Sequence, residues 1–271
     1  MTTPPVRPAV DPRLLAVIVD VAEDIARLLR SGADPAVRIP GATWSVGESA
    51  AHLALANLLM ADLARGVERP YGNGAPAGLA AANEESLAGY PERDPLVLAD
   101  AIVGPARDFA ATCAARPAAE PTDTPLGPMD LGTLASYLLT HMLGHGWDLA
   151  RALGRPHMLD PERVGLAVPF LLTAMPRVLN ARAAAGRSAR YRIVLRGGGP
   201  CFGVVLTDGA VTVSPEAPAR PDCTIATEPV TFLLMALGRC SPTAAIARGR
   251  ILAWGRRPWL APAFPTYFTA P

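Results

Sequence analysis

The spacing of apolar residues changes once along this chain, from a helical period in the first half to a strand period in the second. In the first 155 residues, apolar side chains recur every three or four positions, as on the buried face of a helix. A stretch rich in Gly, Ala and Pro at about 66–92 is expected to be a lid or a partly disordered loop. Together with this long crossover, the helices predict a four-helix bundle. The predicted helices cover about 11–31, 45–66, 93–116 and 130–153.

After a further predicted helix at about 161–184, the pattern changes to short alternating segments that are typical of β-strands. Asp208-Gly209 stands between two of them and favours a two-residue hairpin turn. A helix through Phe232 precedes a last strand that ends at Trp254, and a short Pro-rich tail follows. We therefore expect an α+β fold with two domains, residues 1–157 and residues 158–271. The other predicted strands are 191–196, 202–206, 211–213 and 223–227.

Composition narrows the range of functions. Half of the 271 residues are hydrophobic, which is enough for sizeable cores, and the net charge of +1 argues against a nucleic-acid partner. All 25 basic residues are Arg, so Schiff-base catalysis and a P-loop lysine are excluded. The four cysteines are far apart in the sequence, which favours free thiols in a reducing compartment. They are Cys113, Cys201, Cys223 and Cys240.

The N-terminus and the apolar runs bear on the location of the protein. The first twelve residues are Pro-rich and lack the apolar core of a secretory signal. No uncharged apolar run is long enough to span a membrane. We expect a cytoplasmic protein with small-molecule partners and with neither nucleic acid nor a membrane as a partner. A monomer and a homodimer are both consistent with the sequence.

The histidines carry the strongest chemical signal. His141 and His145 are four residues apart in the segment LGTLASYLLTHMLGHGWDLARALG, so a helix places both imidazoles on one face, where they can bind one cation. His52 lies in another predicted helix of the bundle and can complete a three-histidine site with an open coordination position. The pattern predicts a divalent metal site, with zinc as the expected ion, although nickel, iron and manganese also suit imidazoles. Histidines that hydrogen-bond within the core are the alternative.

Other polar residues adjoin these segments. Asp148 lies seven residues beyond His141 on nearly the same face, where it either supports a ligating ring or is a solvated charge near the helix end. Glu48 follows Ser45 with the spacing of a capping box, so we expect it to cap the helix rather than to bind the metal. His157 is expected at the surface between the two domains.

Two longer motifs surround the histidines. They are Trp44-Ser-Val-Gly-Glu-Ser-Ala-Ala-His52-Leu and His145-Gly-Trp-Asp-Leu-Ala-Arg-Ala-Leu-Gly154. The first resembles the N-terminal motif of the mycothiol-dependent maleylpyruvate isomerase family, and the second resembles another signature of that family. The resemblance covers nearly the whole chain. It implies a DinB/YfiT-like metalloenzyme bundle of four helices, followed by an α+β domain similar to sterol carrier protein 2.

The resemblance also implies a ligand set and a cosubstrate. Carried over by position, a zinc ion is bound by His52, the residue at 141 and His145, and mycothiol is the thiol cosubstrate. Characterised isomerases of this family carry Glu at the position of His141. This chain departs from that pattern and has the all-histidine triad that is common across DinB-like proteins. The exchange removes a negative charge beside the metal and a carboxylate that could act as a base.

These observations favour a metal-dependent enzyme that uses mycothiol for isomerisation or for S-transfer on a small electrophilic substrate. Asp148 and Arg239 are the candidate catalytic residues, and Arg239 is expected to bind either a substrate carboxylate or polar groups of the thiol through its planar guanidinium. Arg196 and Arg220 are alternatives to Arg239. A hydrolase that uses metal-bound water is an alternative function. A non-catalytic protein that binds a hydrophobic ligand is another.

Overall fold

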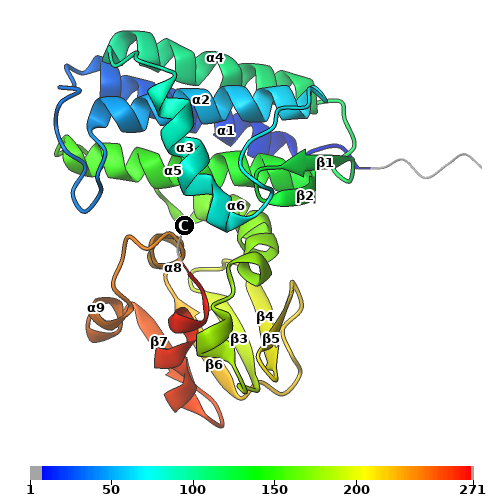
Figure 1. The fold of residues 1–271 in the computed structure, drawn as a ribbon. Coiled ribbons are helices and arrows are strands. Elements are labelled where there is room, and N and C mark those ends of the chain that lie inside the picture. Colours follow the sequence, from blue (N-terminus) through cyan, green and yellow to red (C-terminus); the bar gives the residue numbers. More distant parts are fainter. Residues whose placement is uncertain (1–7, 270–271) are drawn as a thin grey trace, which may run out of the picture. The chain divides into compact units, whose positions relative to one another are not determined.

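The computed structural model describes residues 8–269. The chain divides into two compact units, Met1–Met158 and Leu159–Pro271 (Figure 1). The first unit is mainly helical, and the second contains a sheet of five strands together with short helices. The predicted two-domain α+β fold is confirmed.

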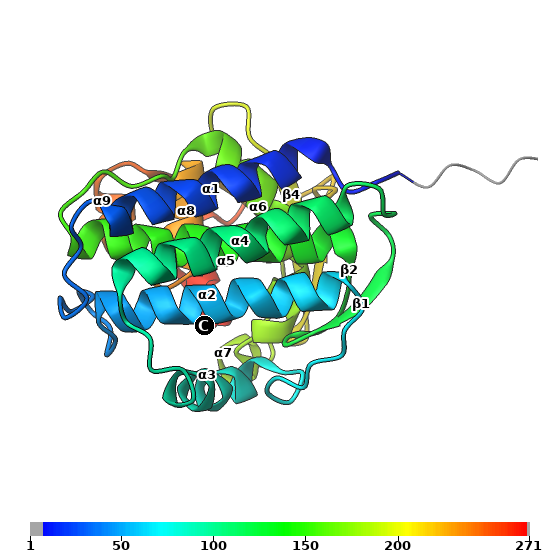
Figure 2. The ribbon, with the colours of Figure 1, turned by 90° about the horizontal axis from the view of Figure 1, so that it is seen from above.

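Four long helices form the core of the first unit. α1 and α2 each pack against both α4 and α5, which is the arrangement of a four-helix bundle (Figure 2). Large apolar side chains such as Ile18, Leu53, Ile102 and Leu138 are fully buried between them. The predicted bundle is therefore present. Its helices are α1 (Pro12–Arg30), α2 (Val46–Ala64), α4 (Pro95–Cys113) and α5 (Leu131–Ala152).

Polar side chains define where the two helices that carry the histidines begin. At the start of α2, the Ser45 hydroxyl accepts the N–H of Glu48, and the Glu48 carboxylate accepts the N–H of Ser45. At the start of α5, the Asp130 carboxylate accepts the N–H of Thr133. These bonds satisfy backbone donors that have no partner inside a helix. The capping role predicted for Glu48 is confirmed.

One prediction for the first unit was wrong, and one hairpin was not predicted. Residues 66–92 are not a plain loop, because η1 (Pro76–Gly78) and α3 (Leu79–Ala88) lie there. The sequence of α3, LAAANEESLA, is rich in strong helix formers but has little apolar periodicity. A hairpin of β1 (Pro121–Thr124) and β2 (Gly127–Asp130) precedes α5, and the Thr124 hydroxyl stabilises its turn by donating to the Gly127 carbonyl. The helix α3 forms because its residues favour a helix, and the hairpin forms around a turn that a side chain stabilises. Neither feature produces a periodic pattern of apolar residues.

The second unit is built on a sheet with the strand order β5-β4-β3-β6-β7. β3 pairs antiparallel with β4 and parallel with β6. β4 and β5 meet at Asp208 and Gly209, whose φ angles of 47° and 84° are those that a type I′ hairpin turn requires. The predicted hairpin is confirmed. The strands are β3 (Ala189–Leu195), β4 (Cys201–Thr207), β5 (Ala210–Ser214), β6 (Cys223–Thr227) and β7 (Ile251–Trp254).

The helices of the second unit are shorter than predicted. The prediction of a single helix over 161–184 was wrong, because the chain forms three separate elements there. Pro176 cannot donate a backbone hydrogen bond, and Asn180 begins a new helix by accepting the N–H of Ala183. The expected Pro-rich tail forms a 3-10 segment, η3. The elements are α6 (Pro161–Ala174), η2 (Met175–Val178), α7 (Ala181–Ala184), α8 (Pro229–Ala236), α9 (Pro242–Ala247) and η3 (Pro258–Tyr267).

Two further expectations concern the thiols and the membrane. The four cysteines are all unpaired, as predicted. Burial raises the pKa of the Cys113 thiol to about 11, so this side chain stays neutral. Over residues 8–269, no helix combines the length and the apolar character that crossing a bilayer requires.

Candidate metal centre

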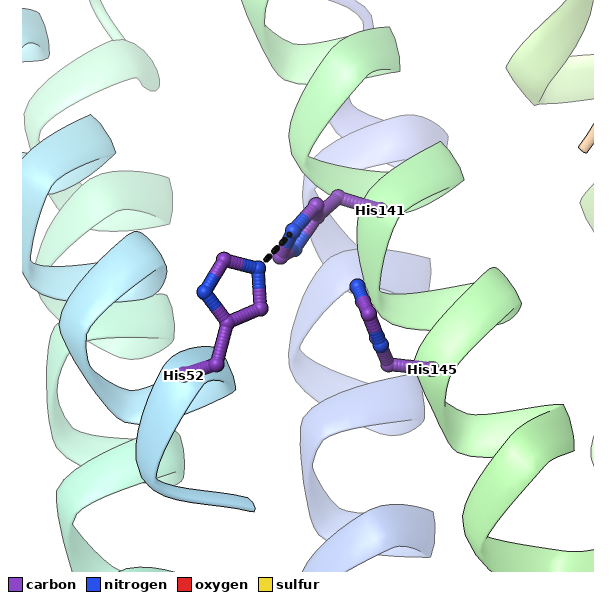
Figure 3. Close-up of side chains that lie close together, drawn as sticks. All are labelled: His52, His141 and His145. Carbon is purple, nitrogen blue, oxygen red and sulfur yellow. Dashed lines mark hydrogen bonds between the residues drawn. The ribbon is translucent and has the colours of Figure 1, made fainter. Parts of the chain in front are cut away.

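His52, His141 and His145 come together inside the bundle (Figure 3). His52 projects from α2, and the other two project from successive turns of α5. One ring nitrogen from each residue can be chosen so that the three lie within 4.8 Å of one another. The Nε2 atoms of His52 and His141 are 3.0 Å apart. The structure thus brings together the three histidines that the sequence proposed as ligands.

The chemistry and the spacing of these donors fit a divalent metal ion. Three imidazoles form a donor set that zinc and other transition metals accept. Bonds of about 2.0–2.1 Å to a tetrahedral zinc place two ligand nitrogens roughly 3.3 Å apart. That separation falls between the 3.0 Å that separates the Nε2 atoms of His52 and His141 and the 4.8 Å limit of the cluster. Three protein ligands leave one coordination position for a substrate atom.

Burial keeps the deepest ring in the form that a metal needs. His52 is 5% exposed, and this burial lowers its pKa to about 4. The ring is therefore neutral near pH 7 and offers a lone pair for coordination. The side chain of His145 is 16% exposed, so the cluster is not sealed from solvent. A small ligand can therefore approach it.

Two aromatic residues adjoin the histidine cluster. The centroid of the Trp44 ring lies 4.8 Å from that of His52 and 6.1 Å from that of His145, and the indole is nearly parallel to the latter. Tyr137 lies one turn before His141 on α5 and meets its ring edge-on at 6.4 Å. Burial raises the pKa of the Tyr137 hydroxyl, so it stays protonated. Neither aromatic residue was predicted from the sequence to contact the histidines. Helical spacing from His141 could have identified Tyr137, whereas Trp44 precedes α2 and gives no periodic signal.

Asp148 lies beside the cluster, and His157 lies outside it. The Oδ2 atom of Asp148 is 3.8 Å from the Nδ1 atom of His145, and the carboxylate is largely buried. Of the two interpretations of Asp148, this position favours support of a ligating ring over a solvated charge. His157 is exposed, as expected.

The candidate arginines lie in the second unit. Arg239 donates a hydrogen bond to the Leu237 carbonyl just after α8. Arg196 donates to the carbonyls of Gly249 and Arg250, so it links the end of β3 to the segment before β7. The structure therefore gives Arg196 a role in the fold. A catalytic role of Arg239 stays a prediction.

Glycines in the two motifs allow close packing around the site. A Cβ atom at Gly146 would lie 2.7 Å from the Met158 sulfur and 3.1 Å from Ile25 of α1. A Cβ atom at Gly47 would lie 3.0 Å from the Cβ of Pro35. Both distances are shorter than ordinary carbon contacts. The glycines therefore let α5 and α2 approach their neighbours closely, beside the residues that carry the imidazoles.

Comparison with known proteins agrees with this architecture. Residues 18–150 match the family of the mycothiol maleylpyruvate isomerase N-terminal domain, and residues 173–255 match the SCP-2 sterol transfer family. A crystal structure of the mycothiol-dependent maleylpyruvate isomerase is similar, with 14% identity over 89% of this chain and 91% of that chain and a TM-score of 0.50. A histidine-to-alanine mutant of that isomerase gives 16% identity over the same shares and a TM-score of 0.51. At these identities, the likeness concerns the fold. None of the curated proteins matches this chain.

Proposed function

Because the chain belongs to the mycothiol-dependent maleylpyruvate isomerase family, with a C-terminal domain of the sterol-carrier type, we propose that it is a metal-dependent enzyme that uses mycothiol. The proposed reaction is an isomerisation or an S-transfer on a small electrophilic substrate. The observation that carries this proposal is the convergence of three imidazole nitrogens from two helices within 4.8 Å. His52, His141 and His145 are the proposed ligands, and zinc is the expected ion.

A divalent cation at this site would supply a Lewis acid that stabilises a thiolate at neutral pH. The chain's own residues prepare the site for it. Burial holds His52 neutral. Asp148, whose Oδ2 atom lies 3.8 Å from Nδ1 of His145, is proposed to stabilise that ring electrostatically and to orient it. Trp44 contacts the rings of His52 and His145 and restrains their rotation.

The residue at position 141 determines the charge of the proposed site. With histidine there, all three ligands are neutral, so a bound cation keeps its full positive charge. This favours the binding of an anionic sulfur over a neutral thiol. With histidine in place of glutamate at position 141, Asp148 is a carboxylate that still lies beside the cluster. In the second unit, Arg239 is proposed to bind a substrate carboxylate through paired hydrogen bonds.

Metal analysis combined with a mycothiol titration tests the proposal. We expect the wild-type protein to bind one divalent ion per chain, and the absorption spectrum of its cobalt form to shift when mycothiol sulfur becomes a ligand. The His145→Ala variant should lose both the metal and the spectral shift. The matched control is His157→Ala, which changes an exposed histidine outside the cluster and should retain both. A folded wild-type protein that binds no divalent metal would contradict the proposal.

Turnover measurements separate this function from the alternatives. A product that forms only when mycothiol is present supports the proposed enzyme. Substrate hydrolysis that proceeds equally well without any thiol favours a hydrolase with metal-bound water. A hydrophobic ligand that co-purifies with folded, metal-free protein favours a binding protein.

A further inference from the structure

Large exposed apolar side chains gather in one region of the second unit. Ile246, Leu252, Trp254 and Trp259 are 42%, 47%, 51% and 69% exposed. They belong to α9, β7 and η3, and each of these elements contacts the other two. Figure 1 shows α9 and β7 on the same side of this unit. We call these four residues, together with Arg248 and Arg257, the tryptophan face.

The strand β7 presents part of this face. It is an edge strand, paired with β6 on one side. Leu252 and Trp254 are two residues apart on it, so their side chains point to the same face of the sheet. Their partners on β6 are the smaller residues Ala226 and Thr224, and the two larger side chains stand out beside them. An exposed apolar patch on a sheet edge is typical of an interaction surface.

The segment that carries this surface has an excess of positive charge. From residue 229 to the end of the chain, the sequence contains five Arg and no Asp or Glu. The nearest preceding acidic residues, Asp222 and Glu228, form ion pairs with Arg256 and Arg250. The exposed tryptophans therefore stand in a region with excess positive charge.

We propose that the tryptophan face docks onto the surface of an anionic lipid bilayer. Indole rings favour the headgroup region, aliphatic side chains enter the acyl boundary, and exposed arginines are attracted to anionic headgroups. Arg248 and Arg257 are both exposed and stand beside the apolar residues in sequence. The expectation that the protein has no membrane partner rested on the lack of a spanning segment, and a surface contact does not need one.

Two other occupants fit the surface less well. A second copy of the chain would bring the same excess of arginines against itself, and like charges across an interface are unfavourable. A single-stranded nucleic acid would use the tryptophans for base stacking, but the aliphatic side chains of Ile246 and Leu252 cannot stack in this way. The combination of aromatic, aliphatic and cationic side chains therefore favours the bilayer.

Sedimentation with lipid vesicles tests the proposal. The full chain should sediment with vesicles of phosphatidylcholine and phosphatidylglycerol, sediment much less with phosphatidylcholine alone, and be released as salt rises. Brominated acyl chains should quench its tryptophan fluorescence. The Trp254→Ser/Trp259→Ser variant should lower partitioning by at least about tenfold, because it removes most of the apolar contact. The Arg248→Gln/Arg257→Gln variant should lower it by about fivefold per arginine.

A control variant changes exposed apolar residues of the first unit. Leu96 and Val97 are exposed on α4, and a Leu96→Ser/Val97→Ser variant should partition like the wild type. Thermal unfolding and circular dichroism verify that each variant is folded. The proposal is overturned if the wild type ignores anionic vesicles, or if the tryptophan variant binds them equally well. Tighter binding to a single-stranded oligonucleotide than to vesicles, or a dimer that the tryptophan substitutions dissolve, would also overturn it.

Discussion

The two units each bury polar side chains, but they do so with different chemistry. In the second unit, the carboxylate of Asp222 is buried, accepts the N–H of Arg190 at 2.9 Å and accepts a hydrogen bond from the Arg256 guanidinium at 2.5 Å. In the first unit, side chains of one kind converge. The imidazole of His52 lies beside those of His141 and His145.

The difference favours a structural role for the Asp222 cluster and is consistent with the proposed metal-binding role of the histidine cluster. The chain supplies the countercharge of Asp222, and this favours a role in stability. The three imidazoles that face one another are uncharged donors, and under the proposed function a divalent cation would bind them. The experiments below test whether stability depends on Asp222 and metal binding on the histidines.

Metal removal is expected to have the largest effect. If the triad binds a divalent ion, chelation should lower the free energy of unfolding of the loaded protein by about 4 kcal/mol when free metal had been at a thousand times Kd. Thermal unfolding with and without a chelator measures this change. The His52→Ala/His145→Ala variant should not respond to the chelator. If the Tm of the loaded wild-type protein does not change on chelation, the histidine cluster does not differ from the Asp222 cluster in its dependence on a metal.

Loss of the Asp222 carboxylate should act on stability without touching metal binding. We expect Asp222→Ala to lower the free energy of unfolding by about 2 kcal/mol, because the backbone N–H of Arg190 loses its acceptor. The partly exposed arginine side chains can return to water, which limits the loss. Urea unfolding measures it, and metal content should stay at the wild-type value. Glu216→Ala, an exposed acidic residue of the same unit, should change stability by less than about 0.5 kcal/mol.

The same carboxylate predicts a pH dependence. Burial raises the pKa of Asp222, but the hydrogen bonds from the Arg190 backbone and the Arg256 side chain outweigh burial, and the pKa lies below its ordinary value of 3.8. The stabilisation is therefore complete above that value and is lost as the pH falls through the lower pKa of the folded state. In acid unfolding, the stability difference between wild type and Asp222→Asn should shrink with falling pH. A difference that stays constant would show that the ionised carboxylate contributes nothing.

Asp148 sharpens the comparison because it is a carboxylate next to the histidines. If it orients His145, Asp148→Asn should weaken metal binding by about tenfold. Competition with a chelating dye measures the affinity. The control Asp123→Asn changes an exposed carboxylate on β1 and should leave the affinity unchanged. Equal affinities for the Asp148 variant and the wild type would show that Asp148 does not support the metal site.

The smallest expected effect is at the start of α2. Ser45→Ala removes half of the capping box and should lower the free energy of unfolding by about 1 kcal/mol. Ser45→Gly should cost only a few tenths of that, because glycine is tolerated at this position. Denaturant unfolding measures both variants. Both should retain the metal, since the histidines lie deeper in the bundle, and a parallel loss of metal would link the cap to the site.

The successes and errors of the sequence predictions have local causes. The long helices are rich in buried apolar residues and begin at polar caps, and the hairpin at Asp208-Gly209 depends on two adjacent residues with positive φ. The elements α3 and β1–β2 bury few apolar residues and were missed. The break within 161–184 depends on Pro176 and Asn180, whose effect the apolar pattern over the same residues obscured.

By itself, the sequence determined that His141 and His145 share a face of one helix, because a helical repeat is a property of neighbouring residues. It also determined where α2 and α5 begin, through side chains that bond to the adjacent backbone. Only the tertiary structure decided that the Nε2 atom of His52, 89 residues away from His141, lies 3.0 Å from the Nε2 atom of that residue, and that Trp44 lies beside the rings of His52 and His145. Contacts of that kind depend on how α2 packs against α5, and packing is decided by the whole core rather than by any short segment.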